Sequence, residues 1–239
     1  MTYFSIDPDR RIVFCDFDGT IACHDVLVLA CETFAPEVTA QVMPQLYNLE
    51  LSLRVGVRQL VEAIPSDRYG AMLELARSQP LRSGLRELIE FLDGQGVEFV
   101  VVSGGIRGMV EAALGDLADR VVGIHAMDVD TTGEYLAVRS EFEGEVELVD
   151  KLKVVSRYLG TPLPAGGFTN ENWIAIGDSV TDLNMALAAP TVFARSRLKT
   201  YLDERGKVYT PYESFFEVRD RLAQLWNVPI FAGLYSSIK

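Results

Sequence analysis

The chain has 239 residues, of which 49% are hydrophobic and 23% charged, as is usual for a folded globular protein rather than a disordered one. Its formal net charge of −12 argues against a nucleic-acid-binding protein, which needs a basic surface to neutralise phosphates. Its apolar runs are far shorter than the ~20 residues of a membrane span, and residues 1–11 contain no apolar stretch typical of a signal peptide. The three cysteines form no zinc-binding or disulfide pattern. We therefore expect a soluble, cytoplasmic protein with neither a nucleic-acid nor a membrane partner.

Short apolar runs that alternate with amphipathic segments predict a doubly wound α/β fold with a parallel sheet. In chain order, the strands are expected at residues 12–15, 98–102, 120–124, 173–176 and 191–194. Between and beside them, helical spacing of apolar residues predicts helices at residues 84–92, 106–114 and 152–159.

One long insertion breaks this alternation. After the first strand, about sixty residues have only helical patterns, at 26–34, 53–64 and 69–77, and Pro36, Pro44 and Pro65 are expected to separate the helices. We therefore predict a helical cap at residues 21–79, inserted into a core made of residues 1–20 and 80–239. A second irregular piece at 127–149 contains a turn-like segment, 131–134, and predicts a β excursion.

The first motif that carries chemistry is Asp16-Phe17-Asp18-Gly19-Thr20, directly after an apolar strand. In open α/β sheets, ligands bind beyond the carboxyl ends of the strands, where both carboxylates can point into one crevice. Asp16 can then attack phosphorus as a nucleophile, and Asp18 can act as general acid and base. On its own, an Asp-x-Asp pair is more often an acidic loop at a strand end, but the apolar run before it and Gly19-Thr20 after it favour the functional interpretation.

Two further motifs can hold a phosphoryl group. Ser103, Gly104 and Gly105 follow a strand and open a helix, where a hydroxyl and backbone N–H groups can cradle phosphate. The same residues are compatible with a helix N-cap that has no ligand. At the start of a later helix, Lys151 can offset charge on the phosphoryl oxygens; Lys153 is the alternative, and an ordinary solvated lysine is the other interpretation.

The fourth motif, Gly177-Asp178-Ser179-Val180-Thr181-Asp182, follows an apolar strand. Mg²⁺ prefers oxygen ligands, commonly one or two carboxylates with water and a phosphate oxygen, and Asp178 suits that role. Asp182 can bind the metal directly or through water, or orient the loop. The alternative for Asp182 is a carboxylate that interacts with a helix dipole.

Together, these four motifs in this order resemble those of the haloacid dehalogenase superfamily of phosphatases. The long helical insertion resembles its phosphoserine-phosphatase-like branch, whose small cap is a helical bundle. The resemblance implies a Rossmann-like core and Mg²⁺ bound by Asp16, Asp178 and the main-chain carbonyl of Asp18, with Ser103 and Lys151 on the phosphoryl group. It also implies hydrolysis of a small-molecule phosphate monoester through an aspartyl-phosphate.

A narrower resemblance, to the phosphatases of methionine salvage, extends over residues 33–36, 193–195 and 211–219. Two alternatives stay open. One is a phosphatase that acts on phosphoserine or on another sugar or acid phosphate. The other is a catalytically silent binding protein on the same fold, against which the complete set of Asp16, Asp18, Asp178 and Lys151 argues.

Four residues are candidates for contact with the rest of the substrate. His24 and Asp25 follow the nucleophile loop and are expected at the entrance to the site. Arg58, on a cap helix, and Arg107, just past the glycine pair, could bind a substrate anion. For His24, Arg58 and Arg107 a solvated surface position is the alternative interpretation.

Overall fold

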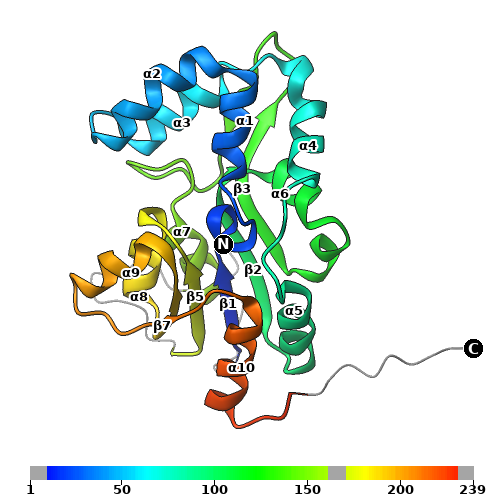
Figure 1. The fold of residues 1–239 in the computed structure, drawn as a ribbon, viewed down its shortest axis with the longest axis vertical. Helices are drawn as coiled ribbons and strands as arrows, with labels where there is room; N and C mark the ends of the chain where they lie inside the picture. Colours follow the sequence, from blue (N-terminus) through cyan, green and yellow to red (C-terminus); the bar gives the residue numbers. More distant parts are fainter. Residues whose placement is uncertain (1–9, 161–170, 231–239) are drawn as a thin grey trace, which may run out of the picture.

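In the computed structural model, residues 10–160 and 171–230 are described, so the N-terminal stretch before Arg10 lies outside the described residues. Seven strands form one sheet in the order β4-β3-β2-β1-β5-β6-β7 (Figure 1). Neighbouring strands are parallel except β3 and β4, which are antiparallel. The predicted α/β class is confirmed. The strands are β1 (Ile12–Cys15), β2 (Glu98–Ile106), β3 (Gly123–Asp130), β4 (Ala137–Arg139), β5 (Trp173–Gly177), β6 (Thr191–Ala194) and β7 (Thr210–Pro211).

The centre of the sheet is fully buried, which explains why its strands are uninterrupted apolar runs. All four residues of β1 and all five of β5 are buried, as expected where helices cover both faces of a parallel sheet. Cys15 pairs with Val101 on one side and with Ile176 on the other. The residues that follow β1 and β5, and those near the end of β2, therefore meet at the same edge of the sheet.

The core helices lie on the two faces of this sheet (Figure 1). Helices α5 and α10 pack against each other, and α6 packs on β2 and β3. Helices α7 and α8 pack together, and α8 also contacts β5. The core helices are α5 (Leu85–Gly94), α6 (Arg107–Leu114), α7 (Lys151–Leu159), α8 (Leu183–Ala188), α9 (Ser196–Asp203) and α10 (Phe215–Trp226).

The inserted segment forms helices that lie beyond the carboxyl edge of the sheet (Figure 1). The helical patterns at 26–34 and 69–77 are confirmed in full, and the one at 53–64 ends three residues early. The assignment of residues 21–79 to a separate cap domain stays a prediction. The cap helices are α1 (Val26–Phe34), α2 (Pro36–Tyr47), α3 (Leu53–Val61) and α4 (Tyr69–Arg77).

Two sequence-based boundaries are wrong for identifiable reasons. Pro44 does not separate helices but lies within α2. Because proline has no N–H, the helix loses the hydrogen bond to the carbonyl of Ala40. Ala40 is exposed, so water can bind that carbonyl instead. The strand expected at 120–124 begins instead at Gly123, because a short 3₁₀ helix (Gly115–Arg120) precedes it and Val122 is 55% exposed.

The irregular piece at 127–149 is a β excursion, as predicted, and it contacts the cap. Its strand β4 pairs with the end of β3, and the turn between them forms an isolated bridge from Tyr135 to Pro65 in the cap. The N–H of Ser66 donates to the carbonyl of Glu134 at 2.9 Å, and that of Leu136 to the carbonyl of Ile64 at 3.0 Å. We call residues 127–149 the hairpin segment; it leads directly into α7.

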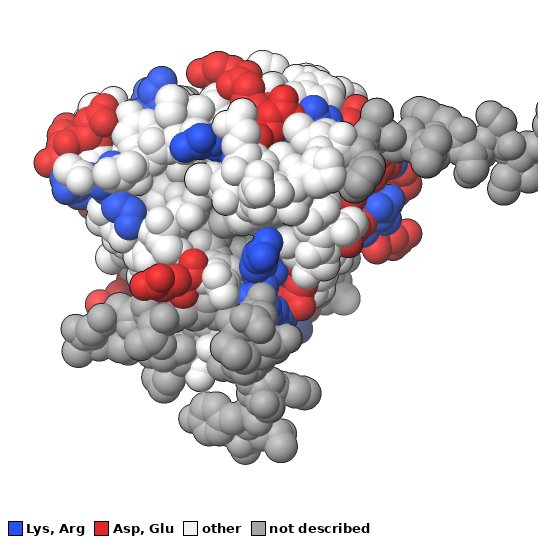
Figure 2. Space-filling model, turned by 90° about the horizontal axis from the view of Figure 1, so that it is seen from below, with Lys and Arg blue, Asp and Glu red and all other residues white. Residues whose placement is uncertain are grey.

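Charged side chains of both signs are scattered over the face of the molecule shown in Figure 2, between broad uncharged areas. On that face, the described residues form no continuous basic surface. Within the described ranges, no helix is both long and apolar enough to cross a membrane.

Candidate active site

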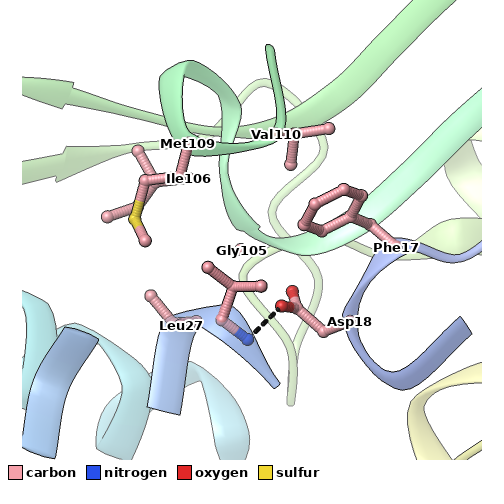
Figure 3. A pocket seen from close by; sticks show the side chains of 8 residues that line it. Phe17, Asp18, Leu27, Gly105, Ile106, Met109 and Val110 are labelled. Atoms are coloured by element: carbon pink, nitrogen blue, oxygen red, sulfur yellow. Dashed lines mark hydrogen bonds between the residues drawn. The ribbon is translucent and has the colours of Figure 1, made fainter. Parts of the chain in front are cut away.

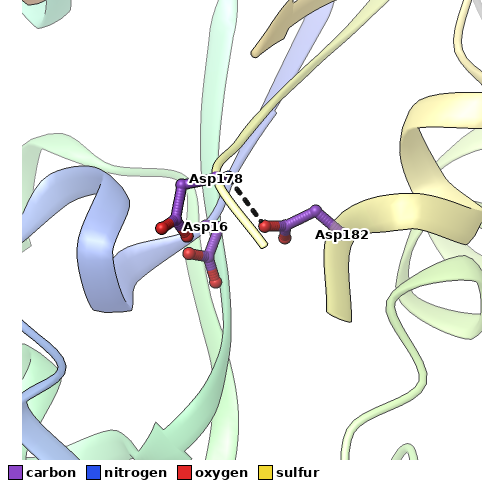
Figure 4. A group of neighbouring side chains, drawn as sticks. All are labelled: Asp16, Asp178 and Asp182. Atoms are coloured by element: carbon purple, nitrogen blue, oxygen red, sulfur yellow. Dashed lines mark hydrogen bonds between the residues drawn. The ribbon is translucent and has the colours of Figure 1, made fainter. Parts of the chain in front are cut away.

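Three carboxylates meet at the carboxyl edge of the sheet (Figure 4). Asp16 follows β1, Asp178 follows β5, and Asp182 ends a short 3₁₀ helix, η4 (Val180–Asp182). One oxygen from each of the three lies within 4.8 Å of the others. Burial and the charges of Asp182 and Asp178 raise the pKa of Asp16, while Lys151 opposes this. The strand order brings together residues that lie more than 160 positions apart in the chain.

The side chain of Lys151 lies among these carboxylates. Its Nζ is 2.5 Å from Oδ1 of Asp16 and 2.6 Å from Oδ1 of Asp182, and the residue is 3% exposed. Burial lowers its pKa, but the two carboxylates more than offset this and raise the pKa above its ordinary value. Lys153 instead donates to the main-chain carbonyl of Glu143 at the surface. Of the two candidate lysines, the structure brings only Lys151 to the aspartates.

The start of α7 explains how Lys151 reaches this position. Asp150 is the N-cap, and its Oδ1 accepts hydrogen bonds from the N–H groups of Leu152 and Lys153. Val154, Val155 and Leu159 are buried and hold the helix against the core. The first helical residue therefore projects into the carboxyl edge of the sheet.

Both oxygens of Asp182 are already engaged by donors. Oδ1 accepts from Lys151, and Oδ2 accepts from the N–H groups of Asp178 at 2.9 Å and Ser179 at 3.0 Å. A Cβ on Gly177 would lie 2.4 Å from Cγ of Asp182, so this close approach requires glycine. Of the roles that the sequence left open for Asp182, these contacts favour loop orientation over direct metal binding.

Asp18 lies beside the cluster in apolar surroundings (Figure 3). Its Oδ1 accepts from the N–H of Val26 at 2.8 Å, and its Oδ2 accepts from the Ser103 hydroxyl at 3.3 Å. Burial, and then the charge of Asp25, raise the pKa of Asp18 to about 7. A carboxyl group with that pKa can both give and take a proton near neutral pH. The surrounding pocket is lined by Phe17, Leu27, Ile106, Met109 and Val110.

Ser103 reaches the site from a strand rather than from a helix. The prediction that residues 103–105 open a helix is wrong, because β2 continues to Ile106 and α6 begins at Arg107. The Ser103 hydroxyl accepts from the N–H of Gly105 at 2.8 Å, which leaves its proton for Asp18. A Cβ on Gly105 would lie 2.9 Å from Oδ2 of Asp18, whereas Gly104 is exposed. The end of β2 thus places a hydroxyl and an accessible backbone beside Asp18.

The donor set fits a hard divalent cation. Asp16 and Asp178 supply carboxylate oxygens, the ligand type that Mg²⁺ prefers. Burial, and then the charge of Asp182, raise the pKa of Asp178 to about 6. Three carboxylates, those of Asp16, Asp178 and Asp182, crowd together beside a single lysine here, so a bound cation would relieve their mutual repulsion.

This crowding predicts a pH dependence of stability. Burial is the main cause that raises the pKa of Asp18, and of Glu147 in the hairpin segment, to about 7 and that of Asp178 to about 6. A carboxyl whose pKa is higher in the folded than in the unfolded state destabilises the fold above the folded pKa, and protonation relieves this as pH falls. We therefore expect the melting temperature of EDTA-treated protein to rise between about pH 8 and about pH 5.

Thermal melts across this pH range measure the effect. Replacement of Glu147 by Gln should flatten the slope, and Mg²⁺ at pH 8 should raise the melting temperature of the wild-type protein. A melting temperature that falls steadily towards pH 5 would contradict the expected sign.

Asp25 and His24 lie at the junction of the nucleophile loop and the cap. Asp25 is the N-cap of α1 and accepts from the N–H of Val28 at 2.9 Å. Asp25 is exposed, and its charge contributes to the raised pKa of Asp18. His24 is exposed, and its carbonyl accepts from the N–H of Gly19 at 3.2 Å. Both stay candidates for substrate contact.

The two predicted substrate arginines have other partners. Arg58 contacts the carboxylates of Glu62 and Glu143 and donates to the carbonyl of Val138 at 3.0 Å, so it joins the cap to the hairpin segment. Arg107 pairs with Asp128 at 2.8 Å and donates to a carbonyl of β3. Because both guanidinium groups are engaged in the fold, we leave them out of the proposed substrate site.

Sequence reasoning missed two arginines at the back of the nucleophile loop. Arg82 and Arg195 both donate to the carbonyl oxygen of Gly19. Arg195 lies in residues 193–195, which resemble the phosphatases of methionine salvage, but no motif or spacing in the sequence indicated Arg82.

The comparison with protein families agrees with this geometry. The family model of the haloacid dehalogenase-like hydrolases matches residues 13–187 of this chain. The chain therefore belongs to the haloacid dehalogenase-like hydrolases.

Its relatives narrow the class further. The chain is 46% identical over 214 residues to the 2-hydroxy-3-keto-5-methylthiopentenyl-1-phosphate phosphatase of Microcystis aeruginosa, which covers 89% of this chain and 97% of the relative. A protein of the same name from Bacillus thuringiensis subsp. konkukian is 34% identical, with 91% and 98% covered. The chain is thus a phosphoric monoester hydrolase, and the prediction of an enzyme rather than a silent binding protein is confirmed.

Solved structures of phosphoserine phosphatases share the fold. One with bound substrate is 17% identical, with a TM-score of 0.63 over 92% of this chain and 99% of its own. The enzyme from T. onnurineus is 16% identical, with a TM-score of 0.66 over 95% and 100%. At this level of identity, the likeness establishes the fold alone.

Proposed function

We propose that this phosphatase hydrolyses 2-hydroxy-3-keto-5-methylthiopentenyl-1-phosphate, an intermediate of methionine salvage. The observation that carries the reaction type is the buried contact of Lys151 with Asp16 and Asp182, beside a carboxyl group, Asp18, suited to proton transfer. The choice of substrate is supported by the relatives of that name, which align over about nine tenths of the chain.

In the first step, a carboxylate oxygen of Asp16 attacks phosphorus in line with the ester bond. The new O–P bond forms as the ester P–O bond breaks, and protonated Asp18 gives its proton to the departing alcohol oxygen. Lys151 offsets the charge of Asp16 and of the phosphoryl oxygens. The products are the free alcohol and an aspartyl-phosphate.

In the second step, water attacks the aspartyl-phosphate. Asp18, now ionised, takes a proton from the water, and the bond between Asp16 and phosphorus breaks to release inorganic phosphate. Both side chains return to their starting protonation states. The apolar surroundings of Asp18 suit this exchange, because burial raises its pKa to about 7.

We further propose that the site holds Mg²⁺ on the carboxylates of Asp16 and Asp178 and the main-chain carbonyl of Asp18. When bound, the ion would act as a Lewis acid on a phosphoryl oxygen. Asp182 would orient the loop that carries Asp178. Ser103, the backbone at Gly104, and Lys151 would hold the other phosphoryl oxygens.

Beyond the phosphate, Asp25 and His24 are our candidates for contact with the polar part of the substrate. Their position at the root of the cap supports this role, since α1 begins at the next residue. A phosphoserine phosphatase is the second candidate function, and the shared fold is the observation that favours it. The predicted cytoplasmic location is kept as part of this proposal.

A substrate panel separates these possibilities. We expect the purified protein to release phosphate from the enol phosphate at least about tenfold faster, by kcat/KM, than from phosphoserine, since one lost polar contact costs about a factor of ten. EDTA should abolish release from both compounds, and Mg²⁺ should restore it. Preference for phosphoserine would overturn the proposed substrate, and EDTA-resistant turnover would overturn the metal assignment.

A further inference from the structure

Arg82 is a buried arginine that binds backbone carbonyls instead of a carboxylate. The residue is 8% exposed; its Nε donates to the carbonyl of Thr20 at 2.7 Å and its Nη2 to that of Gly19 at 2.8 Å. Among the residues that the structure describes, it forms no ion pair. A buried charge is costly unless it is well hydrogen-bonded, so this guanidinium depends on the carbonyls of the nucleophile loop.

Arg195 reaches the same carbonyl oxygen from the other side of the site. It follows β6, and its Nη1 donates to the Gly19 carbonyl at 2.7 Å, while its Nη2 is 3.3 Å from Oε2 of Glu213. Its Nε is buried without a partner among the described residues. Two guanidinium groups therefore converge on one oxygen, and we call Arg82 and Arg195 the carbonyl clamp.

The conformation of Gly19 explains why its carbonyl needs to be held. Gly19 has φ of +76°, in the left-handed region, and a Cβ there would lie 2.6 Å from Oδ2 of Asp178. The loop thus passes directly over a proposed metal ligand. A rotation of the peptide after Gly19 would move Asp18 and Asp178 relative to each other.

The clamp also lies where the two chain connections to the cap run side by side. The N–H of Arg82 donates to the carbonyl of Ile21 at 2.8 Å, and Ala22 forms an isolated bridge with Leu81. Side-chain bonds from Arg82 to the loop, together with those from Arg195 on the core, tie the loop to the core at this point.

We propose that Arg82 and Arg195 are positioning residues, which hold residues 16–20 so that the carboxylates stay aligned for Mg²⁺ and for attack on phosphorus. The proposal rests on the proposed function. The competing explanation is that both arginines merely attach the C-terminal segment through Glu213, whose carbonyl lies 3.5 Å from Nη1 of Arg82. That explanation predicts lower stability with normal metal affinity and normal kcat.

The test uses the full chain and four variants. Arg82→Gln and Arg195→Gln remove the charge but keep one amide donor, and the double variant removes both guanidinium groups. Arg120→Gln is the matched control, because that arginine is at the surface and pairs with Asp93. Calorimetry with Mg²⁺ alone measures metal affinity after EDTA treatment, and p-nitrophenyl phosphate at saturating Mg²⁺ gives kcat and KM.

We expect the Mg²⁺ affinity and the kcat of each single variant to fall about 10- to 100-fold, as for other residues that support metal ligands. KM should change much less. Because both arginines bind one oxygen, the double variant should lose less than the product of the single losses. Folded variants with wild-type Mg²⁺ affinity and kcat would overturn the proposal. If Arg82→Gln does not fold, Arg195→Gln, whose side chain is 18% exposed, decides the question alone. A wild-type protein that releases phosphate from neither p-nitrophenyl phosphate nor the enol phosphate would instead refute the proposed function, while its Mg²⁺ affinity relative to the variants would still test the clamp.

Discussion

Replacement of Asp16 by Asn should abolish turnover while the protein stays folded. The amide has nearly the shape of the carboxylate and can still accept a hydrogen bond from Lys151, but it cannot attack phosphorus. By analogy with the loss of other catalytic nucleophiles, kcat should fall by at least about 10⁴-fold. Acid-quenched protein should carry radiolabelled phosphate in the wild type and none in the variant.

The stability of the Asp16→Asn variant distinguishes a loss of catalysis from a loss of folding. Burial and neighbouring acids raise the pKa of Asp16, so a neutral side chain there relieves repulsion in the metal-free protein. We expect its melting temperature in EDTA to equal or exceed that of the wild type. Asp116→Asn, which alters a surface carboxylate paired with Arg86, is the matched control and should keep full activity. Substantial turnover by Asp16→Asn would assign the nucleophile elsewhere.

Much of the fold could be predicted because strands of a sheet that is buried on both faces are uninterrupted apolar runs in the sequence. Apolar runs located β1, β5 and β6 to within one residue. The outer strand β3 was harder to place, because its second half alternates polar and apolar residues and pairs with β4. The prediction that Pro44 separates two helices was wrong because, on the exposed side of a helix, water can replace the hydrogen bond that proline cannot make.

The proposed catalytic residues could be identified because each follows or lies near the end of a central strand, or begins a helix. The parallel register then brings Asp16, Ser103 and Asp178 to one edge without further information. Sequence alone could not decide between Lys151 and Lys153, since both lie in the first turn of α7. Only the packing of α7 determines which amine enters the site.

The carbonyl clamp could not be predicted, because its contacts depend entirely on tertiary structure. Arg82 lies 63 residues from Gly19, and Arg195 lies 176 residues away. Their partner is a main-chain carbonyl, which every residue possesses and which leaves no signature in the sequence. Arg58 and Arg107 show the converse: the sequence made both candidates for binding a substrate anion, and tertiary ion pairs that it could not reveal engage both guanidinium groups.

Replacement of Lys151 by Met should impair both activity and stability. Loss of the amine removes the group that offsets charge on the phosphoryl oxygens, and kcat should fall about 10²- to 10³-fold, as when a donor is removed from an oxyanion site. It also leaves Asp16 and Asp182 buried without their cation, which typically costs about 3–5 kcal/mol. In a domain of this size, the melting temperature should drop by roughly 6–20 °C.

Two measurements separate these effects. Lys153→Met is the matched control and should behave as the wild type, since within the described part of the chain that amine donates only to a main-chain carbonyl at the surface. Lower pH should recover part of the stability of Lys151→Met, because protonation of Asp16 removes one of the unpaired charges, but it should not recover kcat. If Lys153→Met loses activity and Lys151→Met keeps it, the phosphate-binding lysine is Lys153. If Lys151→Met loses stability alone, the amine serves only to hold the carboxylates together.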